Sequence, residues 1–420
     1  MTFPVLGPGR DQHSIQEQLE AMRINDVSWR DGRAFTLAYS AGQDVLDVAQ
    51  DAYQRFANEN ALNTDAFPSL RKMANDVVNT VLGWTHAPDT GAGFMTSGGT
   101  ESLLLAVRAA RQRRRRQDKR QTDLNIVLPT SAHAAFEKAC SYFEVTSRRV
   151  DVSPDWRADS RAMSNAVDDG TILLVASAPQ YPQGVIDPVT EIAQLAHNSQ
   201  INCHVDACMG GVTLTYLEQL GNNISPWDFR VEGVTSISVD LHKYGYTSKG
   251  AGVLVHRSKE LRNDQTFVTD NWLGGAYGSS GILGTKSGGP IASAWAVMHY
   301  LGDNGYERVT ASARSTALAI ANHIDKHPSL VLLAQPEATL LSFASNDERL
   351  DIFTLADNLR RRGWYLDRQS PPPSLHLTVN AIHNNVMTLF LRHLDEAVTE
   401  SMSGADATQG GSQGAYGTID

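Results

Sequence analysis

The stretch SVDLHKYGY, residues 238–246, ends a short apolar run, and the stretch HVDAC, residues 204–208, ends an earlier one. Both place polar side chains, Asp206 and Lys243 among them, directly after residues that favour a β-strand. Short apolar runs alternate with helical patterns through the middle of the chain, which predicts an α/β fold with a mostly parallel sheet covered by helices on both faces. Ligands of such sheets bind at the carboxyl ends of the strands, so Asp206 and Lys243 are expected to meet there.

A lysine and an aspartate in this arrangement suit pyridoxal phosphate (PLP). The amine of Lys243 can hold the aldehyde of this cofactor as a Schiff base. The carboxylate of Asp206 can keep the pyridine nitrogen protonated, so that the ring accepts electrons from a bond being broken. The two residues therefore predict a PLP-dependent enzyme.

The stretch TSGGTES, residues 96–102, precedes an apolar helical pattern and is typical of a phosphate site. Gly98 and Gly99 let backbone amides approach an anion, and the start of a helix adds a favourable field. Thr100 can add a hydroxyl donor. The alternative is an ordinary turn with a helix cap, but Asp206 and Lys243 favour a cradle for the cofactor phosphate.

Two further residues are candidates for the faces of the cofactor ring. His133 follows a predicted strand and can stack on the pyridine ring, although a lone histidine near a helix start is more often an exposed or capping residue. Cys208 can pack on the opposite face of the ring. The alternative, that Cys208 is simply a small buried apolar residue, is nearly the same prediction. His204, Asp206 and Cys208 share one face of a strand and could instead bind zinc, but no second cluster completes a tetrahedral set, and no metal is expected.

Lys249 lies six residues after Lys243. A second cation beside a Schiff-base lysine can lower its pKa or bind an anionic group of the substrate. The alternative is a solvated loop lysine.

The composition excludes several classes of protein. The 420 residues include 46 acidic and 36 basic ones, and the net charge of −10 argues against general affinity for nucleic acid or anionic membranes. One basic run departs from this balance; it predicts a solvated helix face, with a patch for an anionic partner as the alternative. The run contains Arg111, Arg113, Arg114, Arg115, Arg116, Lys119 and Arg120.

The cysteines and the chain start bear on the compartment. Cys140, Cys203 and Cys208 are odd in number and lack metal-ligand spacing, which favours a reducing compartment. Residues 1–8 do not read as a signal peptide, and no apolar run reaches the roughly 18 residues that span a bilayer. A cytoplasmic protein without a transmembrane segment is expected.

The expected elements place the candidate site residues at strand ends. We expect strands at residues 126–128, 171–176, 201–205, 236–239 and 252–255, and helices at 132–143 and from Pro188 onward. His133, Gln180, Asp206 and Lys243 all follow one of these strands.

Four segments are expected along the chain: an N-terminal segment (1–60), a large PLP-binding domain (61–300), a small C-terminal α+β domain (301–402) and a flexible tail (403–420). A helix from about Ala292 leads into the small domain, which holds strands at 330–333, 340–343 and 375–378. The last helix is expected to end near Met402.

Several motifs together resemble those of sphingosine-1-phosphate lyases. The resemblance covers roughly residues 27–398 and is most specific in the run up to Lys243. It rests on SGGTES (97–102), SAHAAF (131–136), PQYPQGVIDP (179–188), HVDAC (204–208) and DFRVEGVTSISVDLHKYGY (228–246). That family belongs with the group II PLP-dependent decarboxylases, which implies PLP fold type I.

The resemblance implies a role for each matching residue. Lys243 would be the Schiff-base lysine and Asp206 the pyridinium partner, with His133 stacked on the ring. The turn at Gly98, Gly99 and Thr100 would hold the cofactor phosphate together with His242. Lys249 would bind the substrate phosphate, and Tyr39 would be an active-site tyrosine.

The resemblance also implies a homodimer with shared active sites. The segment from Gly274 to Gly289 is similar to one that reaches into the neighbouring subunit's site. No segment matches the membrane-anchoring helix of eukaryotic relatives, so a soluble, bacterial-type version is expected.

Two positions depart from the family pattern. Residues 60–63 read Asn-Ala-Leu-Asn where the family usually has Asn-Pro-Leu-His, so Asn63 replaces an active-site histidine. Asn63 can still donate a hydrogen bond to phosphate, but it cannot carry charge. Phe35 and Thr36 replace a small Ser-Gly pair ahead of Tyr39.

The implied reaction is retro-aldol cleavage of a phosphorylated long-chain base to a long-chain aldehyde and phosphoethanolamine. Tyr39 or the cofactor phosphate are the candidate bases. Two alternatives are a PLP-dependent amino-acid decarboxylase, which would need a carboxylate pocket instead of Lys249, and a catalytically inactive PLP-fold binding protein. The retention of Lys243, Asp206 and His133 argues against the inactive protein.

Overall fold

The structure, a computed structural model, describes residues 7–118 and 122–403. Its strands are β1 (Ala92–Thr96), β2 (Asn125–Pro129), β3 (Thr146–Val150), β4 (Thr171–Ser177), β5 (Asn202–Asp206), β6 (Ser236–Asp240), β7 (Gly252–His256), β8 (Phe267–Thr269), β9 (Tyr277–Ser279), β10 (Leu330–Leu332), β11 (Leu340–Ser345), β12 (Asp367–Gln369) and β13 (Ser374–Thr378). Its α-helices are α1 (Gln12–Met22), α2 (Gln43–Arg55), α3 (Pro68–Trp84), α4 (Gly99–Gln117), α5 (Ala135–Phe143), α6 (Ser160–Ala166), α7 (Val189–Asn198), α8 (Thr213–Gln219), α9 (Lys259–Asn263), α10 (Gly289–Lys326), α11 (Ile352–Arg361) and α12 (Met387–Met402). Two short 3-10 helices lie at Trp29–Asp31 and Ala381–Asn385.

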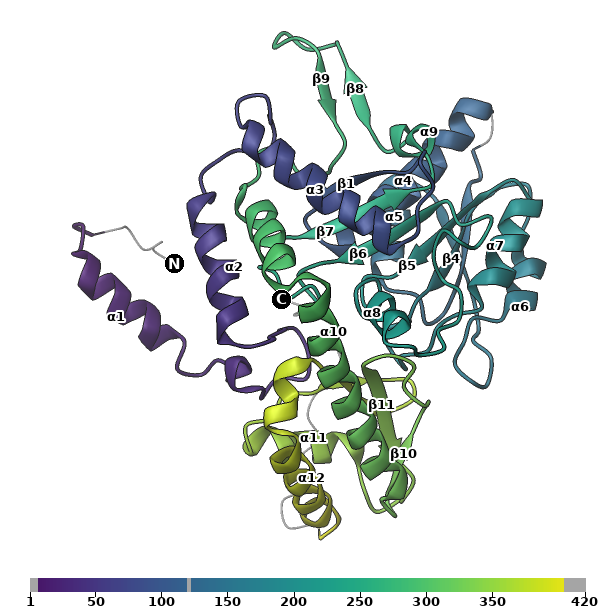
Figure 1. The fold of residues 1–420 in the computed structure, drawn as a ribbon. Helices are drawn as coiled ribbons and strands as arrows, with labels where there is room; N and C mark the ends of the chain where they lie inside the picture. Colours follow the sequence, from purple (N-terminus) through teal and green to yellow (C-terminus); the bar gives the residue numbers. More distant parts are fainter. Residues whose placement is uncertain (1–6, 119–121, 404–420) are drawn as a thin grey trace.

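A seven-stranded sheet forms the centre of the molecule (Figure 1), with the order β1-β7-β6-β5-β4-β2-β3. The neighbours from β3 to β6 are parallel, while β7 runs antiparallel to both β6 and β1. The five residues of β2, of β5 and of β6 are all buried, as expected of strands covered on both faces. The prediction of a mostly parallel α/β sheet is confirmed.

Alternation along the strands divides the core into two layers. Ile126 and Leu128 pack with α4 and α5 on one face of the sheet, whereas Val127 between them belongs to the larger core on the other face. That larger core includes buried residues of α3, α7, α8 and the first part of α10. The carboxyl ends of β4, β5 and β6 are thereby held at one edge of a rigid sheet.

A second, smaller sheet follows α10. It is antiparallel, with the order β10-β11-β13-β12, and packs with α11, α12 and the end of α10 around its own apolar cluster. The backbone of α10 breaks at Gly302, whose φ of 55° lies in the left-handed region that glycine tolerates best. This break lies next to the expected boundary between residues 300 and 301. The domain boundaries themselves stay a prediction, and the tail falls almost wholly outside the described residues.

The strands were predicted less completely at the sheet edges than at its centre. β1 and β3 were not predicted, because the sequence of β1 contains glycine and that of β3 contains Arg148 and Arg149. Both are edge strands, which bury less apolar surface than central ones. Pro188 precedes α7 as its N-cap rather than occupying its first turn.

The basic run on α4 is more involved with the protein than expected. Arg113 donates a hydrogen bond to the Asn202 side chain, and Arg114 donates to the carbonyl oxygens of residues 169 and 171. Arg116 pairs with Asp264. The expectation of a simply solvated face is therefore wrong for Arg113 and Arg114; Lys119 and Arg120 lie outside the described residues.

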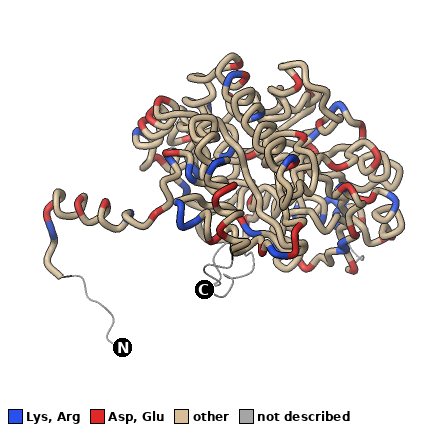
Figure 2. The backbone as a smooth tube through the Cα atoms, turned by 90° about the horizontal axis from the view of Figure 1, so that it is seen from below, with Lys and Arg blue, Asp and Glu red and all other residues tan. Residues whose placement is uncertain are grey.

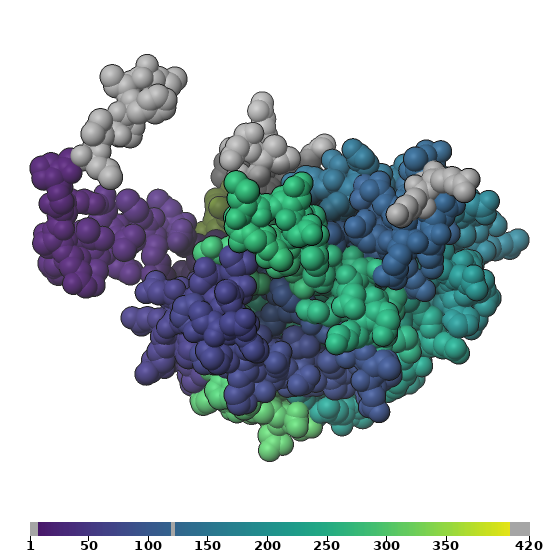
Figure 3. Space-filling view, turned by 90° about the horizontal axis from the view of Figure 1, so that it is seen from above, coloured from purple at the N-terminus to yellow at the C-terminus, as the bar shows by residue number. Residues whose placement is uncertain are grey.

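Two segments stand away from the body of the molecule: α1 (Figures 1 and 3) and the hairpin of β8 and β9 (Figure 1). α1 has no buried residue, and its Ile15, Leu19 and Met22 are exposed. The hairpin and its turn expose Val268, Trp272 and Leu273.

Seen from below, Lys and Arg residues are interspersed with Asp and Glu residues along the backbone (Figure 2). Within the described ranges, no helix is long and apolar enough to cross a membrane.

Candidate active site

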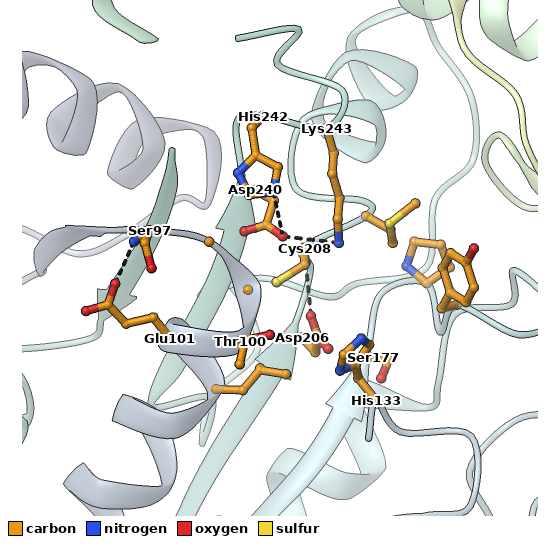
Figure 4. A pocket seen from close by; sticks show the side chains of 16 residues that line it. Ser97, Thr100, Glu101, His133, Ser177, Asp206, Cys208, Asp240, His242 and Lys243 are labelled. Atoms are coloured by element: carbon orange, nitrogen blue, oxygen red, sulfur yellow. Dashed lines mark hydrogen bonds and ion pairs between the residues drawn. The ribbon is translucent and has the colours of Figure 1, made fainter. Parts of the chain in front are cut away.

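A cavity of about 270 Å³ opens at the carboxyl ends of β4, β5 and β6, beside the first turn of α4 (Figure 4). Its lining includes Lys243, Asp206, His133, Cys208, His242, Gly98, Gly99 and Thr100. The structure therefore gathers eight of the predicted site residues around one cavity. Their roles in catalysis and cofactor binding remain proposals.

Lys243 extends from the turn after β6 into this cavity, where its side chain is only 18% exposed. Its Nζ lies 3.1 Å from Oδ2 of Asp240, the last residue of β6. The other carboxylate oxygen of Asp240 is buried and has no hydrogen-bond partner among the described residues. Asp240 is therefore a buried partner of the lysine that the sequence analysis did not single out.

Asp206 ends β5 and is buried at the floor of the cavity. Burial alone would raise the pKa of its carboxyl group, but the neighbouring His133 and Lys243, together with the hydrogen bond from Cys208, hold the pKa below its usual value. The carboxylate is therefore ionised at neutral pH, as a partner for a protonated ring nitrogen must be.

His133 lies in the loop between β2 and α5, beside Asp206 (Figure 4). Its Nδ1 accepts a hydrogen bond of 3.0 Å from the backbone amide of Ala135, which fixes the orientation of the ring. Burial lowers the pKa of His133, and Asp206 opposes this shift. A neutral, oriented imidazole of this kind presents a flat face for stacking.

The glycine turn meets His242 so closely that larger residues would not fit. Gly98 has a φ of 138°, and a Cβ atom there would lie 2.6 Å from Cε1 of His242. A Cβ atom on Gly99 would lie 2.9 Å from the sulfur of Cys208. Glycine at both positions therefore keeps side chains away from the N-terminus of α4, a helix of 19 residues, where an anionic group can bind.

These features fit pyridoxal phosphate. A lysine amine, an ionised buried aspartate and a neutral histidine surround the cavity, and its glycine turn suits a phosphate. In the part of the chain that the structure describes, His242 Nδ1 is buried and has no hydrogen-bond partner, as expected of a group that binds a ligand atom. Cys208 is buried, and burial raises its pKa well above the usual value, so it contributes a neutral thiol.

Tyr39 and Lys249 lie next to each other beside this cavity rather than in its lining. The Lys249 Nζ lies 4.9 Å from the centroid of the Tyr39 ring and 3.4 Å from the carbonyl oxygen of His242. Desolvation of the amine, followed by repulsion from Lys243, lowers the pKa of Lys249 to about 8, although solvent still reaches the residue. By its surface area Lys249 is exposed, so the solvated loop lysine remains an alternative and the binding of a substrate group remains a prediction.

Asn63 does not reach the cavity of its own chain. It is exposed, and its side-chain oxygen accepts a hydrogen bond of 3.0 Å from the amide of Asp65. Gln180 is also not in the cavity lining: it is buried and bonds to Gln183, while the next residue, Tyr181, lines the cavity instead.

The structure explains the departures at Phe35 and Thr36. Phe35 is fully buried in the core of the small sheet, stacked on His383 with 4.1 Å between ring centroids. Thr36 donates a hydrogen bond of 2.7 Å to Asp367, which also accepts one of 2.5 Å from Tyr181. The sequence analysis missed this cluster, because its three members come from distant parts of the chain.

The zinc alternative has no support from the side-chain geometry. Both ring nitrogens of His204 lie within hydrogen-bond distance of serine hydroxyls. In the described part of the chain, no group of three or more His, Cys, Asp or Glu residues is placed to hold a metal ion.

Comparison with known proteins agrees with this site. The model of the pyridoxal-dependent decarboxylase conserved domain matches residues 10–346. Sphingosine-1-phosphate lyase 1 of Rattus norvegicus is 36% identical over 412 residues, which cover 97% of this chain and 72% of the rat protein.

Solved structures extend the comparison. The sphingosine-1-phosphate lyase of Burkholderia pseudomallei has a TM-score of 0.90 and 32% sequence identity, with 96% of this chain and 94% of that chain covered. A glutamate decarboxylase of Lactobacillus brevis has a TM-score of 0.86 at 19% identity, with 97% of this chain and 96% of that one covered, and so shares the fold. The chain is thus a PLP-dependent enzyme of fold type I, and it belongs to the sphingosine-1-phosphate lyase family.

Proposed function

We propose that this protein cleaves phosphorylated long-chain bases, such as sphinganine 1-phosphate, by a retro-aldol reaction that yields a long-chain aldehyde and phosphoethanolamine. The observation that carries the proposal is the position of Lys249 beside Lys243, at one end of a PLP cavity. A second cation there suits a substrate that carries a phosphate. Membership of the lyase family supports the same reaction.

Different residues of the cavity are assigned to different parts of the cofactor. Lys243 would supply the amine that holds the cofactor aldehyde. Gly98, Gly99, Thr100 and His242 hold the cofactor phosphate. When bound, PLP supplies a ring that withdraws the electron pair left on C2 of the substrate as the C2–C3 bond breaks.

Asp206 and His133 set the electronic state of the site. Asp206 keeps a proton on the ring nitrogen, because an ionised carboxylate stabilises the positive charge there. His133 and Cys208 both line the cavity and would contact the two faces of the ring.

We assign the proton of the C3 hydroxyl to Tyr39. Its ring lies against the Lys249 cation, and its hydroxyl lies 3.8 Å from the sulfur of Met209, a residue of the cavity lining. A nearby cation stabilises a phenolate, so Lys249 would make Tyr39 a better proton acceptor. Lys249 at the same time binds the substrate phosphate.

We infer that the protein works as a homodimer with shared active sites. The exposed apolar residues of α1 and of the β8–β9 hairpin support a partner surface. Asn60 and Ala61 donate hydrogen bonds to Thr285 and Lys286. The loop that carries Asn63 therefore lies against the segment from Gly274 to Gly289, which we expect to enter the partner's site. Asn63 then acts on the substrate of the neighbouring subunit.

Two smaller parts of the proposal concern compartment and domains. Cys140, Cys203 and Cys208 are all free and buried, which is consistent with a cytoplasmic protein. We place the large PLP-binding domain at residues 61–300 and the small domain at 301–402; the break of α10 at Gly302 supports this division.

The proposal is tested by incubating the purified, PLP-loaded protein with sphinganine 1-phosphate and identifying the products by mass spectrometry. Phosphoethanolamine together with a long-chain aldehyde is the expected result. Carbon dioxide release from an amino acid, with no cleavage of the phosphorylated base, would instead assign the protein to the decarboxylases.

A further inference from the structure

Beneath Asp206, the sheet contains a row of polar side chains that the proposed reaction does not use. His204 lies two residues before Asp206 on β5 and has no exposed surface. Ser236 and Ser238 occupy β6, the neighbouring strand, and are buried as well. A buried polar row between parallel strands needs internal partners, because water does not reach it.

The strand register brings these side chains together. β5 and β6 pair in parallel, with His204 opposite Ser236 and Asp206 opposite Ser238. His204 Nδ1 lies 2.9 Å from the Ser236 hydroxyl, and its Nε2 lies 3.2 Å from the Ser238 hydroxyl. The Ser238 hydroxyl lies in turn 3.3 Å from Oδ1 of Asp206. The row thus runs without a gap from Ser236 to Asp206.

Hydrogen-bond chemistry fixes the direction of this row. An ionised carboxylate only accepts, so Ser238 donates its single proton to Asp206. The Ser238 oxygen must then accept from His204, which requires the proton of the imidazole on Nε2. Nδ1 of His204 is left as an acceptor, and Ser236 donates to it.

The protonation state of His204 agrees with this assignment. Burial lowers the pKa of His204 to about 4, so the ring is neutral at physiological pH and carries one proton. The thiol of Cys208 completes the arrangement by donating to the Ser238 oxygen over 3.3 Å. Ser238 thereby uses its one donor and both acceptor positions.

All the protons in the row point toward Asp206. Its Oδ1 accepts from Ser238 and, at 3.1 Å, from the backbone amide of Cys208. Both bonds stabilise the charged form and hold the carboxylate in one orientation, and neither uses Oδ2. A carboxylate fixed in this way presents its second oxygen to the cavity, where the cofactor ring nitrogen binds.

We propose that His204 and Ser238 are positioning residues that form a hydrogen-bonded relay to Asp206, which orients its carboxylate and keeps it charged for the cofactor ring nitrogen. This inference rests on the proposed role of Asp206 and on PLP, but not on the identity of the substrate. The relay acts through the sheet, so neither residue touches the cofactor.

The other titratable groups around the relay are few. Asp206 faces His133 from the loop after β2, Lys243 from the turn after β6, and Cys208 on its own segment. His204 faces Asp206 and, from β7, the buried His256.

His256 is a suitable control. It is buried in the same sheet, its pKa is likewise lowered to about 4 by burial, and it bonds to Gln265 over 2.8 Å. Among the described residues, His256 makes no hydrogen bond to His204, Ser238 or Asp206, so its replacement tests the cost of losing a buried histidine alone.

The experiment uses the full-length protein and requires no substrate. The variants are Ser238→Ala, His204→Leu, His204→Gln and the control His256→Leu, with Asp206→Asn as the reference. Two properties are measured for each: the dissociation constant of PLP from the protein, and the pH titration of the visible absorption band of the bound cofactor. Thermal unfolding of the same samples reports the purely structural cost.

The relay predicts a specific pattern. Ser238→Ala and His204→Leu weaken PLP binding by about tenfold to a hundredfold, the size expected for a lost hydrogen bond to a charged acceptor, and shift the absorption titration in the direction of Asp206→Asn. His204→Gln keeps most of the wild-type PLP affinity and absorption titration, because an amide can donate to Ser238 and accept from Ser236. His256→Leu lowers thermal stability but leaves the titration unchanged.

Two results would overturn the relay. One is that Ser238→Ala has the absorption titration and the PLP affinity of the wild type. Ser238→Ala is a small change that keeps the fold even if His204→Leu does not. The other is an equal loss in His204→Gln and His204→Leu. If Asp206→Asn itself leaves the absorption band unchanged, the role of Asp206 falls together with the relay, whereas loss of lyase activity alone would concern only the proposed substrate.

Discussion

The cofactor cavity and the projecting segments, α1 and the β8–β9 hairpin, differ in how much of their side chains solvent reaches. In the cavity, Lys243 is 18% exposed and paired with Asp240, and Asp206 is held from below by Ser238. On the β8–β9 turn, Leu273 is fully exposed at 107% of its reference area. The residues of the first region come together within one chain, whereas exposed apolar residues such as Leu273 are typical of a surface that a partner covers. This contrast supports the proposal that each chain holds its own cofactor and that a second chain contributes to substrate recognition.

The largest expected effect comes from removing the amine that holds the cofactor. Lys243→Ala should lower kcat by about 10³-fold or more, because the variant loses the amine that would hold the cofactor aldehyde. Single-turnover product formation measures this loss. The activity of Lys243→Ala should stay low at every pH, because Asp240 cannot replace the amine. Full activity in this variant would show that Lys243 has no role in the mechanism.

The second effect tests whether the projecting segments form a partner surface. Leu273→Asp places a charge on the exposed turn and should dissociate the homodimer, with the mass in light scattering falling toward the 45.8 kDa of one chain. Activity should fall about tenfold or more as sites lose their partner residues, while PLP still binds.

Leu318→Asp is the matched control, since Leu318 is exposed on α10, away from the hairpin. A dimer that survives Leu273→Asp unchanged, or one that dissociates equally with Leu318→Asp, would contradict the proposed surface.

The third effect separates the two lysines. Lys249→Ala should raise KM for a phosphorylated base by about tenfold to a hundredfold, as expected for a lost charged hydrogen bond, and leave PLP binding unchanged. Steady-state kinetics measure this on a phosphorylated base and on its non-phosphorylated counterpart. An equal loss on both compounds would exclude Lys249 as the phosphate ligand.

The pH dependence follows from the lowered pKa of Lys249. Its amine is charged below about pH 8 and neutral above, so KM for the phosphorylated base should rise as the pH passes through 8. Lys249→Arg keeps the charge to much higher pH and should remove this rise. A KM profile that is the same in wild type and Lys249→Arg would assign the pH dependence to another group.

The smallest effect concerns the position where this chain departs from its family. Asn63→His should raise kcat/KM by no more than about threefold, and more so at acidic pH, where histidine adds a positive charge. The change also removes an acceptor for the amide of Asp65, at a cost to stability of about 1 kcal/mol. A large loss of activity would indicate that Asn63 has a role that histidine cannot fill.

The residues predicted from sequence share a local signature. Lys243, Asp206 and His133 each follow an apolar strand, and Gly98 and Gly99 precede a helix, so a short window of sequence identifies them. Asp240 was missed, although it lies three residues before Lys243, because an aspartate after a strand has many other roles. Thr36, Tyr181 and Asp367 were missed because no window contains them.

The sequence alone determined the sheet class, the cofactor and the residues that would hold it. The reason is physical: in a parallel sheet the carboxyl end of every strand faces the same edge, so residues that follow strands meet without further information. The family resemblance added the reaction.

Only the tertiary structure decided the contacts between chain segments far apart in sequence. Ser238 reaches Asp206 through the register of β5 and β6, and Thr36 reaches Asp367 across 331 residues. The exposure of Leu273 and the surface position of Asn63 likewise depend on what packs around them. Hydrophobic patterns specify which face of an element is buried, whereas the choice of partner follows from how the whole core closes.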